Sequence, residues 1–213
     1  MDVAVSLVQS YLNVNGYFTV AEYPILEVAG SAQARMATDL DILAFRFPNA
    51  GRRKQPFAKR QTVGDVLYEP DPALKCPAGK SDMIVGEVKE GRADLNPAAR
   101  NPLVLAAALT RFGCCSPEHA PEVVAKLLKS GQTRTGHGHV IRMIAFGNSA
   151  VGNNSGLYQT ISLAHVVTFL RDHIKGHWET IRHAQFKDQT MVLLALLEKV
   201  SPRYGASPAS NKT

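Results

Sequence analysis

Apolar and polar residues are ordered along the first half of the chain in a way that predicts one helix and three strands. Residues 2–14 carry Val5, Val8 and Leu12 on one helical stripe, and Gly16 ends the run. Three apolar segments rich in β-forming residues follow. These predicted strands span residues 17–28, 39–47 and 82–89, with a loop of small residues at 30–37.

The second half of the chain predicts helices with short strands between them. Asn101 and Pro102 supply an N-cap and a first-turn proline for a helix that runs through Arg111. Another helix begins near Ser116 and ends at Gly131. The remaining predicted elements are strands at residues 140–146 and 157–161 and helices at residues 162–174 and 188–200.

Two segments lack a regular apolar pattern. Residues 48–81 combine several prolines with a basic run at 52–60, and they are predicted to form an inserted loop or hairpin. Residues 201–213, which read SPRYGASPASNKT, predict a disordered tail. Everything else fits a single domain over residues 1–200.

The order of the predicted elements indicates the fold class. A block of neighbouring strands, followed by helices and one more strand, predicts an α/β domain with a mixed sheet and helices on both faces. A length of 213 residues and a hydrophobic fraction of 45% suffice for a core that needs no covalent or metal staple.

Cysteine content and the chain ends bear on the compartment. Cys76, Cys114 and Cys115 are too few for a disulfide framework, and two of them are adjacent, which favours a reducing compartment. The N-terminus lacks the basic region of a signal peptide. The apolar stretch at residues 191–200 is about half as long as a membrane span. We therefore expect a cytoplasmic protein that does not enter a membrane.

Net charge adds an expectation about partners. The chain has 24 Lys and Arg against 18 Asp and Glu, a formal net charge of +6. A positive surface raises the local concentration of nucleic acid, so nucleic acid is an expected partner. Many proteins with such a charge bind no polyanion, so the charge alone decides little.

The third predicted strand contains Glu87, Val88 and Lys89. Because side chains alternate along a strand, Glu87 and Lys89 project from the same face. Asp41, at the start of the second strand, brings another carboxylate within reach. Two carboxylates and a backbone carbonyl, that of Val88, form a hard oxygen site suited to Mg²⁺ or Mn²⁺. A bound water and a nearby lysine complete the groups needed to hydrolyse a phosphodiester.

The Glu-x-Lys triplet is a weak signal by itself, because it occurs by chance once in roughly 300 positions. Its context carries the prediction. The triplet lies in the one apolar strand of the middle region, and a strand that opens with Asp41 precedes it. The alternative interpretation is a salt-bridged Glu87–Lys89 pair on an exposed strand edge.

The segments TDLDILA (38–44) and VGEVKEG (85–91), in this order of elements, resemble the PD-(D/E)xK nuclease superfamily. That superfamily includes restriction endonucleases and archaeal Holliday-junction resolvases. The resemblance covers residues 2 to about 147, where a helix, three strands, a helix and a strand follow one another. It implies a restriction-endonuclease-like fold with an αβββαβ core, to which C-terminal helices are added.

The same resemblance implies roles for individual residues. Asp41 and Glu87 would hold Mg²⁺ or Mn²⁺, and Lys89 would be the catalytic lysine. Asp39, two positions before Asp41 on the same strand face, is the reserve ligand. The expected substrate is DNA.

The sequence departs from the family pattern in two ways. Many members carry a glutamate on the first helix, whereas this helix offers Asp2 and Gln9. Glu22 or Glu27 on the first strand would have to supply that acid instead. The gap between the second and third strands is also long, so residues 48–81 are interpreted as an insertion.

Pro70 and Asp71 match the written family motif more literally than Asp41 does, sixteen residues before Glu87. Asp71 lies between two prolines in a turn-like sequence, and no strand follows it. Asp41 is therefore the preferred acid.

Other features have weaker functional interpretations. The basic run at 52–60 and Arg92 are placed to contact substrate phosphate, although a solvated loop explains the run equally well. The histidines at 173, 177 and 183 are interpreted as structural or incidental. Adjacent Cys114 and Cys115 with His119 do not predict a zinc site. The glycine-rich segment 147–156 lacks the Lys-Ser/Thr of a phosphate loop.

Three hypotheses remain. The first is a metal-dependent nuclease that hydrolyses DNA with Asp41, Glu87 and Lys89. The second is a catalytically inactive nuclease-fold protein that binds nucleic acid or a protein partner. The third is an unrelated α/β domain in which the Glu-Lys pair is structural. A homodimer is possible under each.

Overall fold

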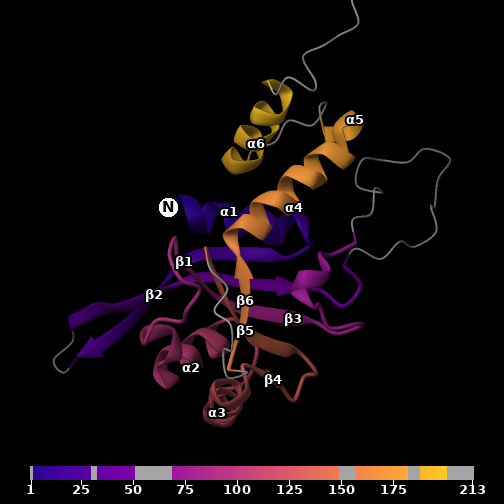
Figure 1. The fold of residues 1–213 in the computed structure, drawn as a ribbon. Helices are drawn as coiled ribbons and strands as arrows, with labels where there is room; N and C mark the ends of the chain where they lie inside the picture. The colour runs from indigo at the N-terminus through magenta and orange to yellow at the C-terminus, as the bar shows by residue number, and fades with distance from the viewer. Residues whose placement is uncertain (1, 30–32, 51–68, 149–156, 182–187, 201–213) are drawn as a thin grey trace, which may run out of the picture.

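The fold is built on a mixed sheet of six strands with helices on both faces, as Figure 1 shows. The computed structural model describes residues 2–29, 33–50, 69–148, 157–181 and 188–200. The basic run at 52–60, His183, most of segment 147–156 and the tail 201–213 lie outside the described residues. The predicted α/β class with a mixed sheet is confirmed.

Three antiparallel strands and one strand parallel to the third make up most of the sheet. β1 (Phe18–Ala29), β2 (Gln33–Arg46) and β3 (Asp82–Val88) follow one another as antiparallel neighbours. β5 (Val140–Gly147) pairs parallel to β3. At the other edge of β5, β4 (Gln132–Arg134) pairs with its beginning and β6 (Gln159–Ser162) pairs with its end.

Helices cover the two faces of the sheet separately (Figure 1). One face is covered by α1 (Val3–Val14) and α4 (Leu163–Gly176), on which α6 (Gln189–Val200) packs as an outer layer. The other face is covered by α2 (Pro102–Arg111) and α3 (Ala120–Ser130). The short helix α5 (Trp178–Ile181) and two 3₁₀ turns, η2 (Pro72–Leu74) and η3 (Ala98–Arg100), complete the described elements.

Two separate hydrophobic cores result from this layering. Ile42 and Ile84 point toward α1 and α4, whereas their neighbours Leu43 and Val85 point toward α2 and α3. Each central strand is therefore apolar on both faces, which explains its continuous run of apolar residues in the sequence. β3 is buried along its whole length.

β2 begins earlier than the sequence analysis predicts. The sequence analysis predicts a loop of small residues at 30–37, but residues 33–37 extend β2, with pairing to β1 as far as Ala29 opposite Gln33. β3 pairs only with residues 42–46 of β2. The earlier part of β2 therefore forms a two-stranded ribbon with β1 that projects past the sheet (Figure 1). Cross-strand pairing overrides weak local propensity here.

The described part of segment 48–81 is built into the fold. η2 follows Asp71, and its Leu74 is fully buried in the core beneath α1 and α4. The Arg142 guanidinium donates hydrogen bonds to the Leu74 carbonyl oxygen at 2.7 Å and to both carboxylate oxygens of Asp82. Residues 69–81 thus run against the sheet and lead directly into β3.

Candidate active site

Asp41 and Glu87 lie next to each other on neighbouring strands. The last β2–β3 pair is Ile42 opposite Gly86, and one further step of this antiparallel register places Asp41 opposite Glu87. Asp41 Oδ2 accepts a hydrogen bond from the Val88 backbone N–H at 2.8 Å. The structure therefore brings together the two carboxylates that the sequence analysis selected, although β2 and β3 are separated by a long segment of chain.

Glu87 is a buried carboxyl group with incomplete hydrogen bonding. The residue is 3% exposed, and its Oε2 has no hydrogen-bond partner among the described residues. Burial, together with the charge of Asp41, raises the pKa of Glu87 to about 7, while Lys89 and a hydrogen bond from the Asn96 side chain act in the opposite direction. An ionised carboxylate with an unpaired buried oxygen has a large desolvation free energy, which a bound proton or cation would offset.

Asp41 has a similar electrostatic setting with weaker burial. Desolvation raises the pKa of Asp41, and the neighbouring charges of Asp39 and Asp2 raise it further. The Val88 N–H and the charge of Lys89 oppose this rise. Several negative groups thus share a small region in which positive charge is scarce, and a divalent cation would relieve their repulsion.

Lys89 lies on the same side of β3 as Glu87, as the strand alternation predicts. Its Nζ is 3.9 Å from Glu87 Oε1, and its side chain is 37% exposed. The Lys89 backbone N–H donates to the Phe146 carbonyl oxygen at 2.9 Å, which continues the parallel β3–β5 ladder by one residue. The lysine therefore has a fixed backbone and an ammonium group that reaches solvent beside a buried carboxylate.

The loop after β3 closes tightly over the end of β5. A Cβ added at Gly147 would lie 2.5 Å from the Ala93 backbone nitrogen and 2.8 Å from the Gly91 carbonyl oxygen. The Asn148 N–H donates to that Gly91 oxygen at 2.6 Å. Only glycine fits such an approach of two backbones. The approach fixes the path of the chain immediately beyond the candidate site.

Asn96 is a site residue that the sequence analysis missed. Its side-chain oxygen accepts from the Ala99 N–H at 2.6 Å, which starts the turn of η3, and its side chain also hydrogen-bonds to Glu87. The dipeptide Asn96-Pro97 signals a turn in the sequence. Nothing in that signal indicates that the turn would contact Glu87.

The acids near the first helix surround Asp41 on its other side. Asp2 caps α1 by accepting from the Ala4 N–H at 2.7 Å, and its charge acts on Asp41. Glu22 lies between the β1–β2 pairs Ala21–Ile42 and Tyr23–Leu40, level with Asp41. Its φ of 50° is strained for a non-glycine residue, and its Oε1 accepts from the Asp2 N–H at 3.0 Å.

The three further candidate residues, Asp39, Glu27 and Arg92, occupy different places. Asp39 is exposed on β2, and its charge raises the pKa values of both Asp41 and Glu87. Glu27 lies opposite Arg35 in the ribbon of β1 and β2. Because Arg35 is six residues before Asp41 on β2, Glu27 lies roughly 20 Å from Asp41 along the strand direction. Arg92 is exposed in the loop after β3, where its charge acts on Asp94.

Asp71, the literal match to the family motif, has a different set of partners. Its Oδ2 accepts from the Tyr11 hydroxyl at 2.7 Å and lies 2.6 Å from His165 Nε2. Burial alone would raise the pKa of Asp71. Hydrogen bonds from the Ala73 N–H, Tyr11 and His165 outweigh burial and hold this pKa below its usual value. This aspartate joins α1, η2 and α4.

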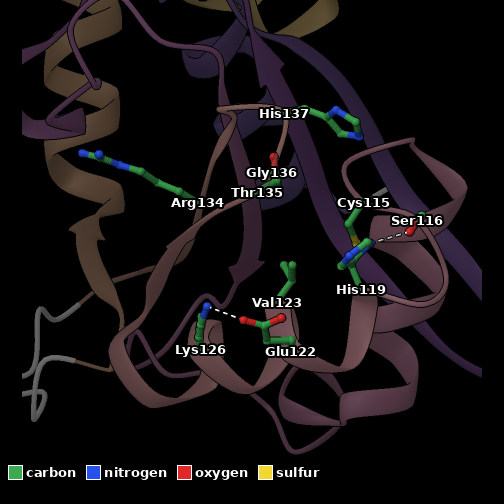
Figure 2. Close-up of a pocket in the computed structure, with 10 residues that line it drawn as sticks. All are labelled: Cys115, Ser116, His119, Glu122, Val123, Lys126, Arg134, Thr135, Gly136 and His137. Atoms are coloured by element: carbon green, nitrogen blue, oxygen red, sulfur yellow. Dashed lines mark hydrogen bonds and ion pairs between the residues drawn. The ribbon is translucent and has the colours of Figure 1, made fainter.

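A separate cavity of about 590 Å³ lies between α3 and the turn after β4 (Figure 2). Lys126 pairs with Glu122 at 2.6 Å and Ser116 bonds to His119 at 2.8 Å, as the dashed lines in Figure 2 show. Burial raises the pKa of Cys115, which also lines the cavity. These paired and buried groups do not suggest a catalytic site.

Within the described residues, no group of three or more His, Cys, Asp or Glu side chains could hold a metal ion. Asp41 and Glu87 supply two carboxylates, and a cation there would need backbone oxygen and water for its remaining ligands.

Comparisons with protein-family models, with curated proteins and with solved structures found no match to this chain. Across the part of the chain that the structure describes, no helix combines the length and apolar character needed to cross a membrane.

Proposed function

We propose that this protein is a metal-dependent nuclease of the PD-(D/E)xK type, with a restriction-endonuclease-like core, which hydrolyses DNA. One observation carries the proposal: the buried Glu87 carboxylate, with an unpartnered oxygen, lies across from Asp41 and beside Lys89. A cation would satisfy that oxygen, whereas a structural salt bridge at 3.9 Å leaves it bare.

The order of the elements supports the same assignment. α1 is followed by three antiparallel strands, a helical segment and a strand parallel to β3, which is the order that the resemblance implies. β4, β6 and the C-terminal helices are additions to that order. Because many functions share similar α/β architectures, the site residues support the proposal more strongly than the fold does.

The donor set suits a hard divalent ion. Asp41 and Glu87 would hold Mg²⁺ or Mn²⁺ with the Val88 carbonyl oxygen, and Asp39 is the reserve ligand. The bound ion would supply a water of lowered pKa and would neutralise negative charge on the phosphate. Water molecules, which such ions retain readily, would fill the remaining positions around the ion.

The protein's own groups have separate tasks around the scissile phosphate. Lys89 has an exposed ammonium group that can orient the attacking water and stabilise the developing negative charge. The Val88 N–H fixes the rotamer of Asp41, and Asn96 restrains Glu87. A net charge of +6 draws the DNA backbone to the surface.

A second candidate function is favoured by the lack of a third acidic ligand at the site among the described residues. An inactive nuclease-fold protein would bind nucleic acid or a protein partner without cleaving it. Weak metal binding by two carboxylates alone would give this result.

The test is a cleavage panel with single-stranded, duplex and branched DNA in Mg²⁺ and in Mn²⁺. We expect the wild-type chain to cut at least one form, and Lys89→Ala to reduce the rate by about 10²-fold or more, because one charge-stabilising group is lost. Lys80→Ala, on a charged residue in the turn before β3, is the matched control and should cut at the wild-type rate.

Circular dichroism of each variant checks that the fold is intact. Binding of every DNA form without cleavage in either metal would replace the nuclease by the second candidate. Equal cleavage by wild type and Lys89→Ala would remove the lysine from the active site.

A further inference from the structure

Two arginines lie close to one aspartate in the loop after β3. The Arg100 guanidinium donates to Asp94 Oδ1 at 3.0 Å, and both side chains are 44% exposed. A hydrogen bond from Tyr158 lowers the pKa of Asp94. The charges of Arg100 and of the exposed Arg92 lower this pKa further, so both guanidinium groups lie near the carboxylate. Two cations share one anion, and the cluster keeps an excess of positive charge.

Arg100 is held in position by two contacts of its guanidinium group. Besides its bond to Asp94, the guanidinium lies over the Tyr158 ring, 5.5 Å from the ring centroid. The Tyr158 hydroxyl donates to the same Asp94 oxygen at 2.7 Å, which joins the ring to the carboxylate. A guanidinium has five N–H donors in a planar fork. Because nearly half of this side chain is exposed, Arg100 retains donors for a ligand that comes from solvent.

The cluster belongs to the loop that reaches the candidate active site. The Asn96 side chain hydrogen-bonds to Glu87. Its oxygen also accepts from the Ala99 N–H, directly before Arg100. The loop thus carries the contact to Glu87 and, on either side of it in the sequence, Arg92 and Arg100.

Negative charge dominates the candidate active site itself. The charges of Asp39 and Asp2 act on Asp41, and the charges of Asp41 and Asp39 act on Glu87. A DNA strand brings one further negative charge with each phosphate. Cations beside the site are therefore needed to hold the backbone against this repulsion, and backbone contacts are what fix the position of DNA on a protein.

The neighbouring acids leave the two arginines available. In the part of the chain that the structure describes, no ion pair links Glu90, the other acid of this loop, to either arginine. The segment 149–156, close before Tyr158 in the sequence, lies outside the described residues and contains no Asp or Glu. That segment has no carboxylate with which to neutralise Arg92 or Arg100.

We propose that Arg92 and Arg100 bind a non-scissile phosphate of the DNA backbone, and that Asp94 and Tyr158 are positioning residues for Arg100. This inference rests on the proposed function for its substrate. Guanidinium forks match phosphate oxygens in both shape and charge. Because phosphate contacts carry no sequence information, the two arginines hold DNA of any sequence equally well.

The experiment measures DNA binding to the full chain by fluorescence anisotropy, in EDTA to prevent cleavage, over a range of salt concentrations. The probes are labelled single-stranded and duplex DNA, each in two unrelated sequences. We expect Arg100→Gln to raise Kd about tenfold for both sequences of a bound form. It should also reduce the slope of log K against log salt by about 1, because one phosphate contact is lost. Arg92→Gln should act in the same direction.

Two further variants separate a phosphate contact from a general effect of charge or structure. Arg134→Gln, at an exposed arginine on β4 beside the beginning of β5, is the matched control and should keep the wild-type slope. Tyr158→Phe removes a positioning contact without changing the charge, so we expect a higher Kd with an unchanged slope. An exposed ion pair contributes little to stability, and circular dichroism checks that each variant is folded.

Four results would overturn the proposal in whole or in part. Wild type that binds no DNA form, or Arg100→Gln with the wild-type Kd and slope, would remove the phosphate site. Equal losses in Arg100→Gln and Arg134→Gln would attribute binding to net charge alone. A wild-type Kd for Tyr158→Phe would remove the positioning role of the tyrosine.

The cleavage panel separates this inference from the proposed function. If the chain binds DNA through Arg100 but cuts no form, the phosphate site stands and the nuclease does not. If the chain cuts DNA, Arg100→Gln should raise KM with little change in kcat, because it removes binding that ground state and transition state share. Cleavage by Arg100→Gln with the wild-type KM would remove the phosphate site and leave the nuclease in place.

Discussion

Glu87 combines three properties that rarely occur in one carboxyl group. It is buried, one of its oxygens has no partner among the described residues, and a second acid faces it from the next strand. Desolvation raises its pKa to about 7, so near neutral pH the protonated and ionised forms of the group differ little in free energy. Under the proposed function, a bound cation would take the place of the proton. Lys89, at 3.9 Å and partly solvated, compensates this charge incompletely.

Stability and activity should respond in opposite directions to Glu87→Gln. In the metal-free protein the folded carboxyl keeps its proton up to about pH 7, whereas the unfolded one loses it near pH 4.5. The folded state then binds more protons than the unfolded state between these values, so the free energy of unfolding falls as the pH rises through this window.

The Glu87→Gln substitution removes this loss of unfolding free energy, which amounts to up to about 3 kcal/mol. We expect metal-free Glu87→Gln to be more stable than wild type in urea titrations above pH 7 and to lose cleavage activity. Glu90→Gln, at the exposed neighbour, should change neither property. A variant that is less stable than wild type at every pH would show that the carboxylate is satisfied in the fold.

The contact between the loop after β3 and the end of β5 is where the secondary-structure elements determine the shape of the candidate site. Gly147 lets the backbone of residues 91–93 approach so closely that no side chain fits between them. The Lys89 N–H, bonded to the Phe146 oxygen, lies just before this contact. The strand that carries Glu87 and the loop that carries Asn96 are thereby held in one arrangement.

Gly147→Ala should disturb this arrangement without touching a candidate catalytic group. The added methyl group would lie 2.5 Å from the Ala93 nitrogen, so backbone has to move, at a cost of about 1–3 kcal/mol. We expect a lower urea midpoint and, under the proposed function, a lower cleavage rate. Gly136→Ala, where an added Cβ would meet nothing within 4 Å, should leave both unchanged. Equal stability of the two variants would contradict the close approach.

The global arrangement depends on a buried charge network at the opposite end of β3. Arg142 on β5 donates to Asp82 on β3, to the Leu74 carbonyl oxygen at the end of η2 and to Gln159 on β6. Tyr17, just before β1, donates to Asp82 at 2.5 Å. One guanidinium and one carboxylate thus connect segments that are far apart in the chain.

Arg142→Met should destabilise the whole domain. Asp82 is fully buried, and removing its cationic partner leaves an uncompensated charge that costs about 3–5 kcal/mol. We expect a loss of this size in the free energy of unfolding, measured by urea titration near neutral pH. Arg134→Met, at an exposed position on β4, should cost little. A small loss for Arg142→Met would mean that water reaches Asp82 in the folded protein.

Local patterns were sufficient to predict much of the fold. Helical spacing of Val5, Val8 and Leu12 predicted α1, and continuous apolar runs predicted β3 and β5. These signals succeed because both faces of a central strand are buried, so its composition is constrained at each position. Asp41, Glu87 and Lys89 were selected by the same reasoning, since strand alternation determines which side chains share a face.

The tertiary structure decided what depends on contacts between distant segments. β4 and the first residues of β2 are strands because a neighbouring strand pairs with them, and neither has a strong pattern of its own. Asn96 reaches Glu87, and Asp71 joins Tyr11 and His165, through packing that no local spacing encodes. The burial that raises the pKa of Glu87 is likewise a property of the assembled layers, because water is excluded by neighbours in space.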